Sequence, residues 1–361
     1  MGFVNDILGF IPQTDWLDVG FNVTRPNDPI DGLFGDERTD NLTATWQSIA
    51  AEYQVPMMAQ FHAFDTIAQK TFRVPVDTHY IEKGLIKVKL NQSERMRALL
   101  RTGVRQDALY DYVLNDGIRL ADQVVTRSKV AKNELMATGK VTIKENNLDL
   151  TVDYGLQNEQ TGNSIDLNNA ADVFSQIQTI VDAAAAAGVA INGMMTSRAT
   201  LSALRRHPSV QAAINGTASV GAYVRANDLE SFLASEFGIT QVITNDLSYG
   251  STADLSAERP AITANRYYPA DKVTFFATNN GGKLGVGLWG DPPEVDVSSL
   301  MQVNQSGVSP YVYVSQWTEN DPAVLWTKAS ALFMPVLYNP SSLWIADVVN
   351  TGDNTGDNTG E

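Results

Sequence analysis

The chain has 361 residues, 43% of them hydrophobic, which is enough to bury more than one core. A formal net charge of −15 argues against a protein that reads nucleic acid, and the absence of cysteine excludes disulfides and thiolate metal sites. The sequence starts without the basic segment of a signal peptide, and no apolar run approaches the roughly 18 residues of a membrane-spanning helix. We therefore expect a soluble intracellular protein with no membrane partner.

The first 50 residues combine an irregular hydrophobic pattern with a strongly acidic charge. Up to residue 40 they hold eight acidic residues against two arginines, a net charge of −6. Proline and glycine interrupt any regular element, yet the stretch contains too many aromatic and aliphatic side chains for a solvated tail. We interpret residues 1–50 as an extended arm that needs another surface on which to lie.

The charge reverses between residues 70 and 101. This stretch has eight basic residues against three acidic ones, a net charge of +5, which leaves −20 for the rest of the chain. Part of it alternates apolar and basic side chains, the pattern of a strand with one apolar and one cationic face. The alternating residues are Ile86, Lys87, Val88, Lys89 and Leu90. Such a strand can be a solvated edge that is protected against aggregation.

A long helix is predicted from residue 105 to residue 136. Its apolar residues recur at spacings of four and seven, which gives a narrow stripe. The stripe consists of Leu109, Val113, Leu120, Val124, Ala131 and Leu135. At about 1.5 Å per residue the helix is roughly 48 Å long, which suits a beam across a sheet. Strict alternation then predicts a hairpin over residues 139–155.

From about residue 165 to residue 290 the pattern becomes compact α/β, with capping residues that mark the helices. The predicted elements are a helix capped by Asp166 and ended by Gly188, a buried strand 191–196, a helix from Ser197 to His207, a helix from Asn227 or Asp228 to Gly238, and strands 241–244 and 273–277. Residues 295–350 return to strands and loops. The tail TGDNTGDNTGE is a short acidic repeat with no apolar side chain to bury.

One glycine motif invites a cofactor interpretation. Gly285, Gly287 and Gly290 form a literal Gly-x-Gly-x-x-Gly, GVGLWG. A dinucleotide site needs a helix directly after the glycines, and the following Asp-Pro-Pro cannot begin one that offers N–H groups. We therefore interpret the glycines as a tight strand turn before Pro292, tolerant of substitution, and expect no cofactor.

The remaining polar residues give no catalytic or metal-binding pattern. The three histidines lack the spacing of metal ligands. Asp291, Glu294 and Asp296 could supply the carboxylate pair of an acid/base hydrolase, an alternative that no other residue supports. We expect no metal, no catalytic residue and no enzyme activity.

Four segments in order carry a family resemblance. They are TGKVTI with LTVDYG after the long helix, VDAAAAAGVAINGMMTSRATLSAL, YYPADKVTFFA, and WTENDPAVLWTKASALFMPVLYNPSSLWIADV. Over roughly residues 45–348 the chain thus resembles the major capsid proteins of tailed phages, in particular the lambda-type "major capsid protein E" family. The first 40 residues and the acidic tail carry no such resemblance.

The resemblance implies a fold. It is the α+β Hong Kong 97-type capsid fold, with an N-terminal arm, an extended loop, a peripheral domain of spine helix and sheet, and a compact α/β axial domain. Mapped onto this sequence it predicts the arm at 1–50, the peripheral domain at 51–69, 104–160 and 295–335 with its spine helix at 105–136, the extended loop at 70–103, the axial domain at 161–294 and 336–350, and an acidic tail at 351–361.

The resemblance also implies a function, the major capsid protein of a tailed double-stranded DNA bacteriophage. Hexamers and pentamers of the chain would close an icosahedral shell in the bacterial cytoplasm and remain in the virion. The implied partners are further copies of itself, a portal at one vertex, scaffolding and decoration proteins, and packaged DNA held without sequence-specific contacts. A host-encoded nanocompartment shell of the same fold stays open as an alternative.

On this interpretation the basic stretch is a strap between subunits. Apolar contact supplies adhesion, and charge selects the acidic surface on which the strap lies. An acidic receiver is present at the start of the long helix. The candidate intersubunit residues are Arg73, Lys83, Ile86, Lys87, Val88, Lys89, Leu90, Arg95, Asp107, Asp111 and Asp116. Reversing Lys87 and Lys89 to Glu should then impair assembly and leave the subunit folded.

Overall fold

A computed structural model gives the fold of most of the chain. It describes residues 28–48, 58–59, 73, 77–92, 106–146, 148–168, 172–216, 221–252, 261–278, 282–295, 302–305, 311–321 and 323–349. Arg95, Asp296, the first 27 residues and the acidic tail lie outside the described residues, as do the side chains of Asp107 and Asp111.

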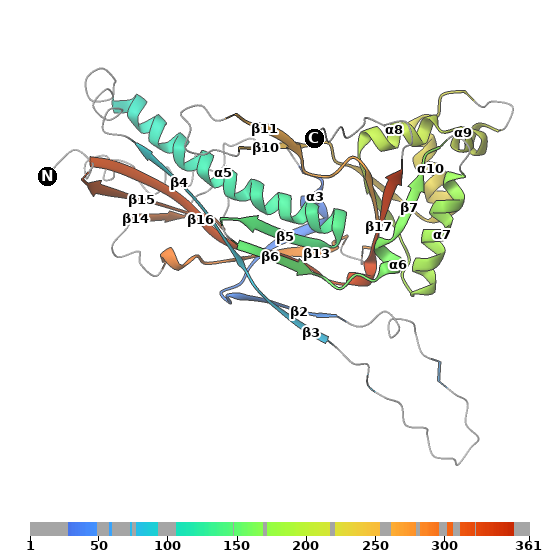
Figure 1. The fold of residues 1–361 in the computed structure, drawn as a ribbon, viewed down its shortest axis with the longest axis horizontal. Coiled ribbons are helices and arrows are strands. Elements are labelled where there is room, and N and C mark those ends of the chain that lie inside the picture. Colours follow the sequence, from blue (N-terminus) through green and yellow to red (C-terminus); the bar gives the residue numbers. More distant parts are fainter. Residues whose placement is uncertain are drawn as a thin grey trace, which may run out of the picture.

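The larger layer is a six-stranded sheet with one long central strand (Figure 1). Its strands are β1 (Phe34–Arg38), β4 (Gly84–Gln92), β13 (Gly285–Gly290), β14 (Gln302–Gln305), β15 (Tyr313–Asn320) and β16 (Ala323–Leu337). The 15-residue β16 pairs antiparallel with β4, β13 and β15, while β1 pairs parallel with β13. The strand β16 therefore organises the whole layer.

The helix α5 (Gln106–Thr138) lies along this sheet (Figure 1). The stripe residues Leu120, Val124 and Leu135 are at most 4% exposed and pack in the same core as β16. This confirms the long helix to within two residues at its end. None of the helices in the described part of the chain is long and apolar enough to span a membrane.

The predicted hairpin follows α5 directly. It consists of β5 (Lys140–Glu145) and β6 (Leu148–Asp153), paired antiparallel with Val141 opposite Val152. Both valines are buried, so the alternating pattern does mark an inward face. The positive φ of Gly139, +70°, lets the chain leave the helix and enter the strand at once.

A second layer stands beside the first and has its own hydrophobic core (Figure 1). Its five-stranded sheet has the order β7 (Asn163–Asp166), β17 (Leu343–Val349), β12 (Lys272–Phe276), β8 (Gly193–Thr196) and β9 (Gln241–Thr244). Its helices are α6 (Asn158–Thr161), α7 (Val173–Ala186), α8 (Arg198–Arg206), α9 (Pro208–Asn215) and α10 (Ala226–Phe237). The shorter elements of the chain are α3 (Ile30–Leu33), β10 (Ser248–Ser251), β11 (Thr263–Arg266) and the 3-10 turns η3 (Pro293–Val295) and η4 (Pro340–Ser342).

The predicted helix boundaries in this layer are correct in part. Ser197 caps α8 by accepting a hydrogen bond from Thr200 N, and Gly238 ends α10 in the left-handed conformation. Asp166 is not a cap: it ends β7, and Asp172 caps α7 instead. The third helix, α10, begins at residue 226, one or two residues before the predicted start. Several Asp and Asn residues near these positions can cap a helix, and sequence alone did not choose among them.

Residues 70–103 are predicted to be one extended loop, but the described part beyond residue 83 is a strand of the larger sheet. Residues 84–92 are this strand, β4, paired with β16 across nine positions. The prediction failed because the apolar side chains Ile86 and Val88 pack against the core beneath α5. A second pair, β2 (Thr43–Ser48) and β3 (Asp77–Glu82), projects from the body instead (Figure 1). We call this pair the ribbon.

Two further segments lie elsewhere than predicted. Residues 34–38, assigned to the free arm, form the sheet strand β1. Residues 285–290, assigned to the axial domain and to a tight turn, form β13, a fully buried strand of the larger sheet. In both cases the pairing partner is distant in sequence, so local pattern could not identify it.

Candidate functional site

The glycines of β13 make room for large buried side chains. A Cβ atom at Gly285 would overlap the carbonyl oxygen of Val336 and lie 2.6 Å from the Phe34 ring. At Gly287 it would lie 2.6 Å from Asp36 Oδ1. The motif therefore serves close packing, and the expectation that it tolerates substitution is wrong. In the described residues that follow, Asp291 to Val295, the chain forms only the short 3-10 turn Pro293–Val295.

Acidic residues of the 28–38 segment bind the C-terminal half of α5. The Lys132 ammonium, 1% exposed, lies 2.9 Å from Asp36 Oδ1 and 3.6 Å from Asp31 Oδ1. Lys129 lies 3.0 Å from Asp31 Oδ2. Trp289 Nε1 donates a hydrogen bond of 2.8 Å to the same Asp36 oxygen. The acidic segment thus lies on a basic surface of its own subunit.

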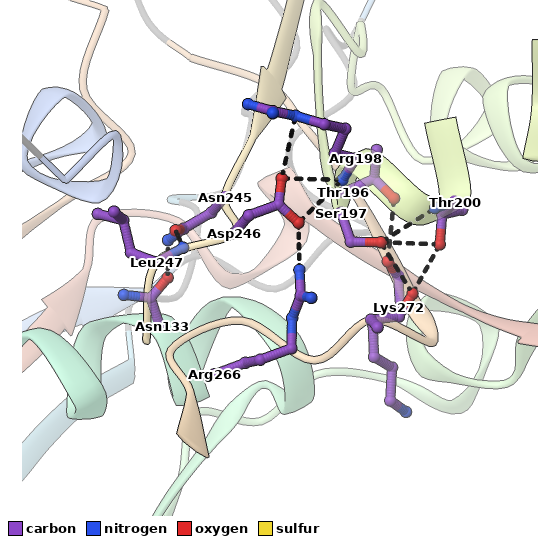
Figure 2. Close-up of polar contacts among 11 residues, drawn as sticks. Asn133, Thr196, Ser197, Arg198, Thr200, Asn245, Asp246, Leu247, Arg266 and Lys272 are labelled. Atoms are coloured by element: carbon purple, nitrogen blue, oxygen red, sulfur yellow. Dashed lines mark hydrogen bonds and ion pairs between the residues drawn. The ribbon is translucent and has the colours of Figure 1, made fainter. Parts of the chain in front are cut away.

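A buried amide cluster joins this segment to both layers. Asn245, at the end of β9, donates to Asn133 Oδ1 of α5 at 2.9 Å and to Asp28 Oδ1 at 3.2 Å. The three side chains are at most 1% exposed, and Ile30 N also donates to Asp28. Burial raises the pKa of Asp28, against the backbone hydrogen bond from Ile30. Figure 2 shows Asn133 and Asn245 facing each other across the boundary between the layers.

Beside this cluster, Asp246 fixes the start of α8 (Figure 2). Its carboxylate accepts hydrogen bonds of 3.2 Å from Arg198 N and forms an ion pair with Arg266. The C-terminal end of α5 also reaches the second sheet, because Thr274 Oγ1 of β12 donates to Met136 O at 2.8 Å. The helix α5 is therefore attached to both layers.

On the sheet, Glu294 draws two lysines together. Lys87 Nζ of β4 and Lys328 Nζ of β16 each lie 2.9 Å from Glu294 Oε1, and Ser330 Oγ donates to Oε2 at 3.4 Å. Burial alone would raise the pKa of Glu294, but the hydrogen bonds from Lys328 and Lys87 lower it to about 2. The carboxylate is thus ionised at neutral pH and holds β4 to β16.

Because the pKa of Glu294 in the folded chain lies below its usual value near 4.5, the ionised form stabilises the fold. This stabilisation is present above pH 4.5 and is lost as the pH falls towards 2. We expect Glu294→Gln to reduce the free energy of unfolding by about 1–2 kcal/mol at pH 7, and the difference from wild type to shrink below pH 4. Chemical denaturation between pH 2.5 and 7 measures it, with the exposed Glu230→Gln as control. A difference that is constant across this range would contradict the assignment.

An alternating basic and aromatic row continues beside Glu294. Lys89 Nζ lies 4.3 Å from the centre of the Trp326 ring, and Trp326 stacks on Trp317 at 6.1 Å. Lys328 in turn lies over Trp317 at 5.6 Å. On the cationic face of β4, Lys89 therefore already has a cation–π partner within its own subunit.

The candidate intersubunit residues fall into separate environments. Lys83 and Asp116 are buried, at 3% and 2% exposed, and burial raises the pKa of Asp116. Ile86 and Val88 are half-buried under α5. The exposed candidates are Arg73, Lys87, Lys89 and Leu90. Of the eight candidates whose side chains the structure describes, four are thus exposed in the single subunit.

The two described carboxylates of the hydrolase alternative, Asp291 and Glu294, have separate partners. Asp291 accepts a hydrogen bond of 2.6 Å from Arg38 Nη2 and one of 3.1 Å from the Tyr313 hydroxyl, whereas Glu294 binds its two lysines. A carboxyl with a pKa of about 2 cannot act as a general acid near neutral pH. Within the described residues no group of three His, Cys, Asp or Glu could hold a metal ion.

Sequence reasoning missed the buried polar residues that join the layers. Lys132, Asn133 and Asn245 occupy positions at which a polar residue is normally solvated. A weak signal was present for Lys132 and Asn133, since both lie within one turn of the buried stripe residues Ala131 and Leu135. Nothing local distinguishes Asn245.

Comparison with known proteins places this geometry in a family. The model for the phage major capsid protein E family matches residues 64–348. No curated protein matches the chain. The putative capsid protein of a prophage of E. coli CFT073 is similar with a TM-score of 0.54 and 14% identity, over 93% of this chain and 97% of that one. A phage-related protein from Bordetella bronchiseptica RB50 is similar with a TM-score of 0.52 and 10% identity, over 92% and 96%.

The solved structures are alike in fold, a mixed helix and sheet fold of the Hong Kong 97 type found in phage capsids. The family match is independent of that likeness and covers well over half of the chain. It also includes α5, the glycine strand β13 and the strands of both sheets apart from β1 and the last residue of β17. The chain belongs to the phage major capsid protein E family.

Proposed function

We propose that this chain is the subunit of the head shell of a tailed double-stranded DNA phage, and that it assembles as hexamers and pentamers into an icosahedral particle. The family match over residues 64–348 is the observation that carries the proposal. Cyclic rings need two different surfaces on each subunit that fit one another. The projecting ribbon supplies one such surface, and the body of the neighbouring subunit would supply the other.

The surface of the chain supports this assignment. The ribbon residue Tyr80 is 72% exposed, and Leu148 and Leu150 at the tip of the β5–β6 hairpin are 60% and 43% exposed. Exposed large apolar side chains of this kind are typical of contact surfaces. We propose that the ribbon corresponds to the extended loop of the family fold, the layer with α5 to its peripheral domain, and the five-stranded layer to its axial domain.

Fewer residues than predicted are suited to a contact between subunits. We propose that Arg73, Lys89 and Leu90, which are exposed, contact a neighbouring subunit, and that Arg95, Asp107 and Asp111 belong to the same contacts. Lys87 is less suitable for a charge reversal, because it also binds Glu294 of its own chain. Lys89→Glu alone costs the subunit less, because among the described residues it gives up only the contact of Lys89 with the Trp326 ring.

The proposal extends to partners and location. The shell would enclose DNA without sequence-specific contacts, which suits a chain of net charge −15. Further copies of the chain, a portal, and scaffolding or decoration proteins are the proposed partners. The particle would form in the host cytoplasm and persist in the virion, and the chain would have no enzyme activity.

Size-exclusion chromatography and negative-stain microscopy of the purified chain test this proposal. We expect closed particles or rings of five and six subunits, far larger than the 39.3 kDa monomer. Nucleic acid inside particles isolated from the native host would support a phage head, whereas a cargo enzyme would indicate a nanocompartment. A chain that stays monomeric at every concentration and salt condition would contradict both shell assignments.

A further inference from the structure

The direction of the ribbon is decided at its base. Among the described strands, β2 and β3 pair only with each other, with Ala44 opposite Ile81 (Figure 1). These two residues pack against the core of the larger layer, and Ala44 is 1% exposed. The adjacent Thr45 and Tyr80 are exposed. The body therefore holds the ribbon over a short length, and the contacts there control its angle.

Lys83 occupies this base, at the junction between β3 and β4. Its ammonium donates to Thr39 O at 2.8 Å, to Trp289 O at 3.1 Å, and to the Thr39 hydroxyl. Its backbone N–H donates to Leu42 O at 3.0 Å. The three donors of the ammonium are thus all used. They connect the segment that leads into β2 with the end of β13.

The opposite strand is shaped to receive this side chain. A Cβ atom at Gly290 would lie 3.0 Å from Lys83 Nζ and 3.2 Å from Lys83 Cδ. Lys83 is 3% exposed, and burial lowers the pKa of its ammonium, while the charges of Asp291 and Asp40 oppose that shift. A buried lysine is costly unless its hydrogen bonds are complete. A solvated lysine would be sufficient if only the charge were needed, so the burial of Lys83 indicates that its position matters.

We propose that Lys83 is a positioning residue that fixes the direction in which the ribbon leaves the body. Two strands of six residues span about 20 Å, so a tilt of about 10° at the base displaces the far end by about 3–4 Å. A shift of that size is enough to misalign an interface whose packing is as close as a protein interior. The geometric role stands by itself, and only its consequence for assembly rests on the proposed function.

Distance measurements on the unassembled subunit test the geometric role. The chain contains no cysteine, so Thr78→Cys, near the far end of the ribbon, and Gln123→Cys, on α5, give a unique pair of spin-label sites. Both side chains are exposed. We expect Lys83→Met to broaden or shift the distance distribution by several ångströms in pulsed double electron–electron resonance. Gly290→Ala, which keeps the lysine but presses on it, should give a smaller shift in the same distribution.

Two lysine variants separate positioning from general destabilisation. Lys132→Met removes another buried ammonium, away from the ribbon, and should lower the melting temperature without moving the distribution. Lys144→Met removes an exposed ammonium and should change neither. If Lys83→Met fails to fold, as judged by circular dichroism, Gly290→Ala carries the test. A wild-type distribution in Lys83→Met and Gly290→Ala, or an equal shift in Lys132→Met, would overturn the proposal.

Particle formation by the same variants tests the consequence for assembly. We expect Lys83→Met to reduce the yield of regular particles by tenfold or more, because misdirected ribbons miss their neighbours. If the distance shifts but even the wild-type chain forms no particles, the positioning role of Lys83 is supported and the proposed function fails. If the wild-type chain forms particles and the distance does not shift in the variants, the positioning role of Lys83 is wrong and the proposed function stands.

Discussion

Replacing Gly285 with alanine is expected to destabilise the subunit by about 3 kcal/mol or more. The added methyl group would overlap the backbone oxygen of Val336 and press on the Phe34 ring. Neither group can retreat easily, because Gly285 pairs with Leu337 in β16 and with Phe34 in β1. Urea denaturation followed by circular dichroism measures the change in the free energy of unfolding.

Gly32→Ala is the matched control for this substitution. Gly32 lies in the helix α3, its φ is not positive, and no atom lies within 4 Å of its virtual Cβ. We expect no loss of stability there, or a gain of up to about 1 kcal/mol, because alanine favours a helix over glycine. Equal destabilisation at both positions would mean that the packing of β13 is looser than the structure indicates.

The second large effect is expected at Val124 in α5. Its side chain is fully buried in the core that α5 shares with β16. Val124→Asp would place a carboxylate among apolar groups, at a cost of about 4 kcal/mol or more unless the group takes up a proton. We expect insoluble protein, or a subunit that unfolds at a much lower urea concentration than wild type.

Gln123→Asp provides the comparison, because Gln123 is the exposed neighbour on the same helix. Like Val124→Asp, Gln123→Asp adds a carboxylate to α5, but at an exposed position. Its free energy of unfolding should stay within about 0.5 kcal/mol of the wild-type value. Soluble protein of normal stability from Val124→Asp would show that α5 presents a different face to the sheet.

Elements that depend on local pattern could be predicted from the sequence. The stripe around Leu120 and Val124 identified α5, and alternation around Val152 identified the hairpin, because side-chain spacing follows directly from helix and strand geometry. Alternation also gave β4 its apolar face correctly. The alternation could not show that α5 covers this face. Nor could it show that β16, more than 230 residues later, pairs with the edge of β4.

The buried polar site was beyond local reasoning for a similar reason. A lysine such as Lys83 carries the same side chain in solvent and in a core, and only a glycine at residue 290 makes the core position available. Likewise Asp28, Asn133 and Asn245 satisfy one another only after the two layers have come together. These residues come into contact only in the folded chain, and no short segment of the sequence contains all of them.

The course of the chain from the ribbon into the sheet gives the subunit a mechanical property. The strands β3 and β4 follow one another in a single line (Figure 1), separated only by Lys83. A pull on the ribbon would therefore act along β4, at right angles to the hydrogen bonds that join it to β16. Those bonds would share the load in shear and would not break one after another. The chain then continues from β16 through η4 into β17, so tension entering at the ribbon passes covalently from one layer to the other.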